Sequence, residues 1–155
     1  MAKKIEVRAP DTEIAFGVLP ELIGYQLRLA QIAIFRDFET TLGALDITPG
    51  LFGVLVIIEA NPDLKQTTLA KATHLDRSTV VSVIDSLEKR ALVERRAAEN
   101  DRRSNALRLT PAGTALLKKL KRQVALHEKR LAGNLNDQER ATLVRLLRKI
   151  LPEHR

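Results

Sequence analysis

Small hydroxyl and basic side chains recur at helical spacing in residues 77–90. At about 100° per residue, Val80, Ile84 and Leu87 fall on one apolar stripe. The opposite side carries Ser78, Thr79, Ser82, Ser86 and Lys89, and Arg77 lies near the helix start. Small hydroxyls let a helix approach base edges closely and hydrogen-bond to bases or phosphates, and Arg77 with the free N–H groups of the helix start suits a phosphate. This segment alone fits two interpretations equally, a helix that reads DNA and an amphipathic helix with a solvated face.

A basic hairpin is predicted immediately after that helix. Residues 92–96 and 105–110 have strand composition, and the arginines of this region are Arg95, Arg96, Arg102, Arg103 and Arg108. An arginine on an exposed tip suits the narrow minor groove of DNA, where the negative potential is enhanced. Asp101 would repel DNA if it faced it, so we expect this residue to brace the tip by holding an arginine. A helix followed by a basic hairpin favours a winged helix-turn-helix over the alternative of a solvated charged turn.

Caps and prolines delimit the helices that must position this segment. We expect a first helical segment that runs to about residue 45, with Asp11 as the candidate cap of its start and Pro20 either beginning the main helix or kinking it. The later helices are predicted at 49–60, 66–73, 77–90 and 111–132, with a last one that Pro152 ends. Their predicted caps are Thr48, Asp76, Thr110, and Asn136 with Glu139 as a capping box. The predicted fold class is mainly α with a small β-hairpin wing.

Charge is distributed unevenly along the 155 residues, whose net charge is +7. Residues 1–60 hold 5 Lys/Arg and 8 Asp/Glu, a net of −3, whereas residues 61–155 hold 21 and 11, a net of +10. A basic balance favours a polyanion as partner, either nucleic acid or an acidic membrane surface. The excess lies in the part of the chain that contains the hairpin, although many soluble proteins are basic for solubility alone.

Several classes of protein are disfavoured by what the sequence lacks. It has no cysteine, which excludes disulfides, thiolate metal sites and cysteine nucleophiles. The three histidines do not have metal-ligand spacing, and no nucleophile–base pair stands out, so we expect no catalytic residue, no metal and no cofactor. Without a signal-peptide pattern or an apolar run of transmembrane length, we expect a cytoplasmic protein with no membrane association.

The ordered motifs between residues 66 and 113 resemble the MarR (multiple antibiotic resistance regulator) family of bacterial winged-helix regulators. The matching residues are Leu69-Ala70, Ser78-Thr79-Val80, Ile84, Leu87-Glu88, Leu92-Val93-Glu94-Arg95, Asp101-Arg102-Arg103, Leu109-Thr110 and Gly113. A looser resemblance covers residues 20–150. One departure is Ala91, where the family usually has glycine before Leu-Val, so we expect the turn there to be tighter or differently formed.

The resemblance implies one domain, 1–155, with residues 48–110 as the DNA-binding lobe and 11–45 with 111–152 as dimerisation helices. It implies a homodimer that represses transcription at double-stranded DNA and releases the DNA when a small, often aromatic, ligand binds. Arg103, with Arg102, then goes toward the minor groove, and Asp101 braces the wing. For a two-fold dimer the operator should be a pseudo-palindrome with half-sites about one DNA turn apart.

All five aromatic residues lie in the first third of the chain, where the ligand pocket of the family would map. The candidate effector residues are Tyr25, Arg28, Phe35, Arg36, Phe38 and Phe52. Aromatic walls suit a planar ligand, and an arginine can pair with its carboxylate. Segments 24–28 and 35–38 are similar to regulators of aromatic-acid catabolism, which implies an aromatic acid or its coenzyme A thioester as effector. For any one of these residues, core packing or surface charge is the simpler explanation.

Several functional classes stay open at this point. A dimeric, ligand-responsive DNA-binding repressor fits the motifs best, and an activator would differ only through its promoter. A non-specific architectural or RNA-binding protein is an alternative, but the basic segment has no aromatic residues for base stacking. An enzyme lacks a supporting constellation, and a protein-interaction adaptor explains the hairpin arginines less well than DNA does.

Overall fold

The structure is a computed structural model that describes residues 14–98 and 101–151, with side chains described outside 97–105. Hydrogen bonds at the helix starts explain where its helices begin. Thr48 Oγ1 accepts from the backbone of Leu51 at 3.2 Å, and Thr110 Oγ1 accepts from Gly113 N at 2.9 Å. Asn136 and Glu139 form the reciprocal capping box, at 2.8 and 2.9 Å. These predicted caps are confirmed, whereas Asp11 lies outside the described residues.

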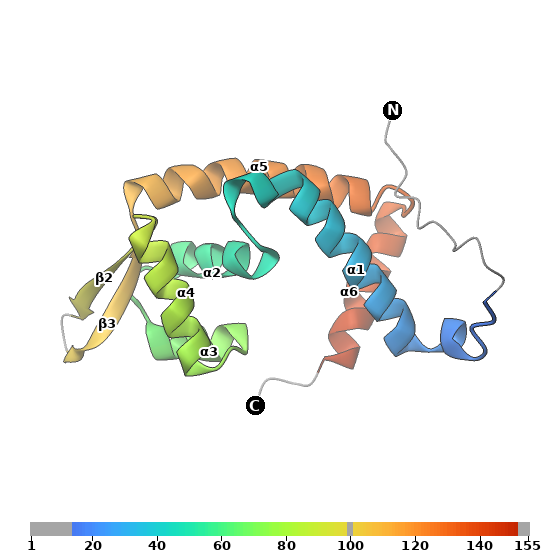
Figure 1. Cartoon of the computed structure of the whole chain (residues 1–155), viewed down its shortest axis with the longest axis horizontal. Helices are drawn as coiled ribbons and strands as arrows, with labels where there is room; N and C mark the ends of the chain where they lie inside the picture. The colour runs from blue at the N-terminus through green and yellow to red at the C-terminus, as the bar shows by residue number, and fades with distance from the viewer. Residues whose placement is uncertain (1–13, 99–100, 152–155) are drawn as a thin grey trace. The chain divides into compact units, whose positions relative to one another are not determined.

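The described part of the chain is mostly helical, as predicted (Figure 1). A short 3-10 turn η1 (Leu19–Glu21) contains Pro20, so the proline precedes the first helix instead of kinking it. The remaining elements are α1 (Ile23–Leu42), η2 (Gly43–Leu45), α2 (Pro49–Ala60), β1 (Leu64–Lys65), α3 (Gln66–Thr73), α4 (Arg77–Lys89), β2 (Val93–Ala98), β3 (Asp101–Leu109), α5 (Pro111–Leu131) and α6 (Asp137–Ile150).

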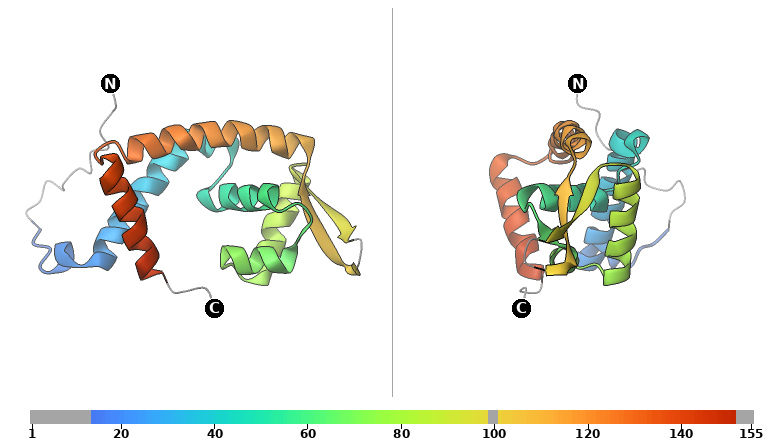
Figure 2. Two further views of the ribbon diagram at one scale, coloured as in Figure 1. Left: turned by 180° about the vertical axis from the view of Figure 1, so that it is seen from behind. Right: turned by 90° about the vertical axis from the view of Figure 1, so that its left-hand side faces the viewer.

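Strand β3 is the middle strand of a three-stranded antiparallel sheet of order β1-β3-β2. Leu64 pairs with Leu107, and Val93 pairs with Leu109. Figure 2 shows the two long strands of the hairpin side by side. The hairpin is longer than predicted, and β1 was not predicted at all because two residues carry no alternating pattern.

The chain divides into two compact units, and the boundary between them falls inside α1 and α5. The central unit is Phe38–Gln123, and the terminal unit is Met1–Asp37 with Val124–Arg155. The predicted DNA-binding lobe, 48–110, falls wholly within the central unit. Every buried apolar side chain in the described part belongs to the central unit.

The apolar stripe of α4 forms part of the core of the central unit, as the sequence predicts. Val80, Ile84 and Leu87 are at most 1% exposed, and Leu55, Leu69 and Leu107 from α2, α3 and β3 are fully buried in the same unit. Burial of each such side chain stabilises the fold by about 1.5–3 kcal/mol. Because this stripe is fixed by packing, the opposite face of α4 must point to solvent.

Candidate nucleic-acid interface

A single carboxylate organises the start of α4. Asp76 accepts hydrogen bonds from Thr79 N at 2.8 Å, from Ser78 Oγ at 2.5 Å and from Thr79 Oγ1 at 2.6 Å. These bonds, with that from the Ser78 hydroxyl contributing most, hold the pKa of Asp76 well below its usual range. The predicted cap is confirmed, and the hydroxyls of Ser78 and Thr79 are both engaged by it.

The polar face of α4 combines engaged hydroxyls with uncommitted cations. Ser82 Oγ donates to the carbonyl oxygen of Ser78 at 3.1 Å. Arg77 and Lys89 are exposed, and neither side chain forms a hydrogen bond or an ion pair with any residue in the described part. These two cations are therefore available to an external anion, while the hydroxyls already donate their protons within the protein.

Helix α4 ends in a left-handed turn at Ala91, where φ is 53°. The N–H of Ala91 donates to Glu88 O at 2.8 Å and that of Leu92 donates to Leu87 O at 2.9 Å, which is the Schellman pattern. Glycine is favoured at this position because a Cβ atom is strained there. The turn is thus a regular Schellman motif in which the alanine is held in a strained backbone conformation.

The cap residue Arg90 joins the end of α4 to the turn that follows α1. Its guanidinium donates to the carbonyl oxygens of Leu45 and Asp46, each at 2.9 Å. The bond to Leu45 is partly shielded from water, whereas the bond to Asp46 is exposed. Both ends of α4 are thus fixed, one by Asp76 and the other by Arg90.

The arginines of the hairpin that the structure describes are all paired with acids of the chain. Arg95 contacts Asp85 and Glu88, each at 2.5 Å. Arg96 contacts Glu94 at 2.6 Å. Arg108 donates to both carboxylate oxygens of Asp63, and this bond holds the pKa of Asp63 below its usual range. The base of the hairpin is thus locally compensated in charge, a pairing that the sequence analysis missed.

The predicted tip residues lie beyond these pairs. Asp101, Arg102 and Arg103 fall in the backbone of β3, but their side chains lie outside the described residues. Their assignment to the minor groove and to bracing of the wing stays a prediction. The paired arginines of the hairpin can be recognised only through their acidic partners, which are Asp63, Asp85, Glu88 and Glu94. The sequence separation between each acid and its arginine follows no regular pattern, so the sequence alone does not indicate these pairs.

The candidate effector residues are divided between the two units. Tyr25, Arg28, Phe35 and Arg36 belong to the terminal unit, where Tyr25 packs near Phe16 with ring centroids 6.5 Å apart. Phe38 and Phe52 belong to the central unit, and Phe38 is a core residue at 4% exposure. The effector site remains a prediction from the sequence.

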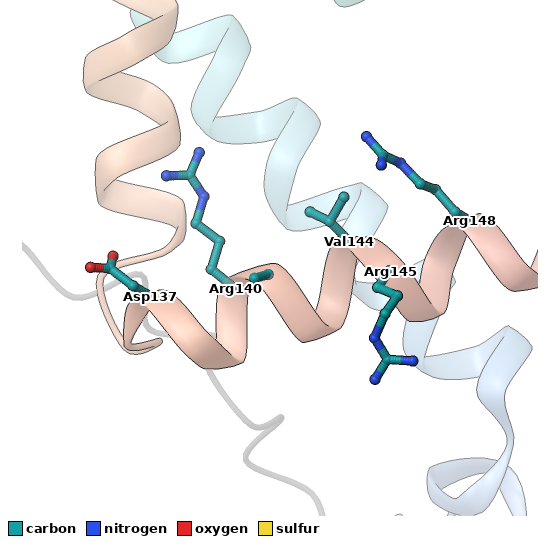
Figure 3. Close-up of a pocket in the computed structure, with 6 residues that line it drawn as sticks. Asp137, Arg140, Val144, Arg145 and Arg148 are labelled. Atoms are coloured by element: carbon teal, nitrogen blue, oxygen red, sulfur yellow. The ribbon is translucent and has the colours of Figure 1, made fainter.

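The terminal unit carries an open hollow on α6, with a volume of about 530 Å³ (Figure 3). Its lining residues are Asp137, Arg140, Ala141, Val144, Arg145 and Arg148, none of which was predicted as a ligand residue. Arg140, Val144 and Arg148 project from the same side of the helix. Three arginines against one carboxylate make this a positively charged surface.

A buried histidine connects α5 to α1 within the terminal unit. His127 is 2% exposed, and its Nδ1 lies 2.6 Å from Asp37 Oδ2, which also accepts from Arg130 at 3.1 Å. Burial raises the pKa of Asp37, but the hydrogen bonds from His127 and Arg130 outweigh it, and the net pKa is lowered. Asp37 is therefore ionised near neutral pH, and His127 donates to it through Nδ1.

Two further findings concern the described residues only. No group of three or more His, Cys, Asp or Glu side chains there is arranged to hold a metal ion. No single helix there is long and apolar enough to span a membrane. Two consecutive helical segments, 23–45 and 49–60, are together long and apolar enough, but the chain bends between them.

The fold is that of the winged-helix class of DNA-binding proteins: the capped helix α4, with exposed cations, is followed by an antiparallel hairpin. Residues 47–104 match the model of the MarR family. A transcriptional regulatory protein for the hcr operon of Thauera aromatica is 37% identical over 139 residues, which cover 89% of this chain and 84% of that protein. The chain belongs to the MarR family, whose members are DNA-binding transcriptional regulators and not enzymes.

Solved structures agree with this assignment. The transcriptional repressor CouR bound to a 23-mer DNA duplex is 38% identical, with a TM-score of 0.86, over 90% of this chain and 99% of that one. CouR bound to p-coumaroyl-CoA is 36% identical, with a TM-score of 0.82, over 91% and 99% of the two chains. The winged-helix fold predicted from the sequence is confirmed.

Proposed function

We propose that this protein is a cytoplasmic, dimeric repressor that binds a pseudo-palindromic duplex and leaves it when an aromatic acid or its coenzyme A thioester binds. The observation that carries the proposal is α4, whose hydroxyl and cationic face is exposed and whose two ends are fixed by Asp76 and Arg90. A rigid helix with this face, beside a hairpin, is suited to the major groove. The relatives described as repressors favour repression over activation.

The hydroxyls of α4 are proposed to act as acceptors toward bases. Ser78, Thr79 and Ser82 each donate their proton to an oxygen of the protein. Their oxygen lone pairs are therefore the groups left to interact with DNA. These lone pairs can accept hydrogen bonds from the amino groups of adenine and cytosine in the major groove. Arg77 and Lys89, which have no partner in the described part, are assigned to phosphates or to acceptor atoms of guanine.

A second copy of the chain is the proposed partner of the terminal unit. Of the 18 large apolar side chains that are exposed in the described part, 16 lie in this unit, on η1, α1, α5, α6 and the segments beside them. This concentration of exposed apolar side chains in one unit favours a protein partner for it. Sedimentation equilibrium should therefore give the mass of a dimer, and a monomer at micromolar concentration would contradict this part of the proposal.

The effector proposal is supported by charge as well as by the relatives. The hollow on α6 is lined by Arg140, Arg145 and Arg148, of which Arg140 also lies 3.7 Å from Glu128, and these cations complement the phosphates of coenzyme A. If this surface holds those phosphates, R145M/R148M should weaken binding of p-coumaroyl-CoA in calorimetry. A matched control, K118M/K119M, removes two exposed cations from α5 and should leave it unchanged.

Fluorescence anisotropy tests the whole proposal. The purified protein is titrated with a duplex from upstream of its own gene and with a scrambled duplex, across a salt series. Selective, salt-sensitive binding that p-coumaroyl-CoA reverses is expected. Equal affinity for both duplexes would indicate a non-specific architectural protein, and selective binding that no aromatic acid or thioester reverses would refute the effector part alone.

A further inference from the structure

The recognition helix carries two acids that face away from its apolar stripe. The side chains of Asp85 and Glu88 are 47% and 42% exposed. Two uncompensated carboxylates on a helix that lies against DNA would repel the phosphates. Compensation of these two charges therefore favours DNA binding, and Arg95 is the residue that supplies it.

Arg95 of β2 occupies the position between these acids. Nη2 donates to Asp85 Oδ1 and Nη1 donates to Glu88 Oε2, each at 2.5 Å. Nε faces Gln66 Oε1 at the start of α3, at 3.4 Å, and the backbone N–H of Arg95 faces the other oxygen of Glu88, at 3.4 Å. The side chain of Arg95 is 18% exposed, the lowest value among the paired arginines of the hairpin.

Every nitrogen of this guanidinium therefore faces an acceptor of the protein. A planar fork that meets two carboxylates and an amide is a specific geometry, which a lysine does not reproduce. The three partners come from α3 and α4, while Arg95 itself comes from β2. One side chain thus connects both helices of the helix-turn-helix to the first strand of the wing.

We propose that Arg95 is a positioning residue, which fixes the recognition helix to the wing and neutralises Asp85 and Glu88, and that it does not contact DNA phosphate. This assignment replaces the expectation from the sequence, which counted Arg95 with the DNA-binding arginines. It rests on the proposed DNA reading by α4, and it names the residue that sets the geometry of that reading.

The salt dependence of binding separates the two roles. A phosphate contact contributes about one unit to the slope of log K against log salt, on any duplex, whereas a positioning residue contributes nothing to it. The experiment measures anisotropy of wild type, R95M and K89M on a scrambled duplex and on a duplex selected by the wild type from a random library. Lys89 is the matched control, because it is exposed and has no partner in the described part.

For R95M we expect an unchanged salt slope on both duplexes, a modest loss of affinity for the scrambled duplex because Asp85 and Glu88 are left uncompensated, and a loss at least tenfold larger for the selected duplex. For K89M we expect the slope to fall by about one on both. The proposal is overturned if the salt slope of R95M also falls by about one. It is overturned as well if R95M binds the selected duplex with the affinity of the wild type. If the wild type selects no sequence, the operator proposal fails, while the slope on the scrambled duplex still decides the role of Arg95.

A second variant covers the case in which R95M does not fold. D85A removes a negative charge from α4, which on charge alone should tighten DNA binding. If Asp85 acts by holding Arg95, the variant instead weakens binding to the selected duplex severalfold. Tighter or equal binding by D85A, with a native circular dichroism spectrum, contradicts the proposal.

Discussion

The left-handed alanine after α4 should make a mutation to glycine stabilising. Ala91 has a φ of 53° and is exposed, so no packing is lost when its Cβ is removed. An L-residue with a Cβ pays about 1–2 kcal/mol in this region. Glycine also gives the unfolded chain more conformational entropy, which lowers the free energy of unfolding by about 0.4–1 kcal/mol. The difference predicts that A91G raises the free energy of unfolding by about 0.5–1 kcal/mol.

Thermal and urea unfolding of A91G and wild type test this value at one fixed protein concentration, because assembly would make the midpoint depend on concentration. For a chain of this size the gain corresponds to an increase in Tm of about 1–4 °C. The matched control is A125G, the same chemical change at an exposed position inside α5, which should lose about 1 kcal/mol. Equal or lower stability of A91G would refute the reasoning, since the turn would then not strain the alanine.

Three further predictions concern the same lobe. G113A should destabilise the protein by more than about 3 kcal/mol in urea unfolding, because its Cβ would lie 2.0 Å from the carbonyl oxygen of Leu92; a folded, stable G113A would show that this contact relaxes easily. D76A should lower Tm near neutral pH, and the difference from wild type should shrink as pH falls below about 4. The pKa of Asp76 is lowered in the folded state, so its stabilisation is present above the pKa of the unfolded chain and is lost on acidification. A difference that does not depend on pH would argue against an ionised cap, and D76N should retain part of the stability. R90M should lose about 1–2 kcal/mol of unfolding free energy, since a charged donor leaves two carbonyls; a change below about 0.3 kcal/mol would show that water replaces the guanidinium at no cost.

Local signals made most of the helices predictable. Thr48, Asp76 and Asn136 cap helices through bonds to residues three positions ahead, so the information lies within one turn of the chain. The strand β1 was missed because it exists only through its pairing with Leu107, which lies 43 positions after Leu64. Short pairing of this kind leaves no periodic trace in the sequence.

The candidate site was only partly predictable, for the same reason. The exposed face of α4 follows from its apolar stripe, which is a local pattern. The role of Arg95 depends on acids in another element and on an amide in α3, and that of Arg108 on Asp63, 45 positions earlier. A count of arginines therefore predicts a basic surface correctly but does not tell which arginines are already neutralised by the chain.

The contact between Arg90 and the turn after α1 has an evolutionary consequence. Both of its short bonds end on main-chain carbonyl oxygens, at Leu45 and Asp46. Every amino acid carries that oxygen, so replacement of either side chain leaves the acceptor in place. The Arg90 contact therefore places no demand on the side chain at position 45, and at position 46 the left-handed backbone, with φ of 51°, favours Gly, Asn or Asp. Position 90, in contrast, is restricted to a residue long enough, and with enough donors, to reach both carbonyls.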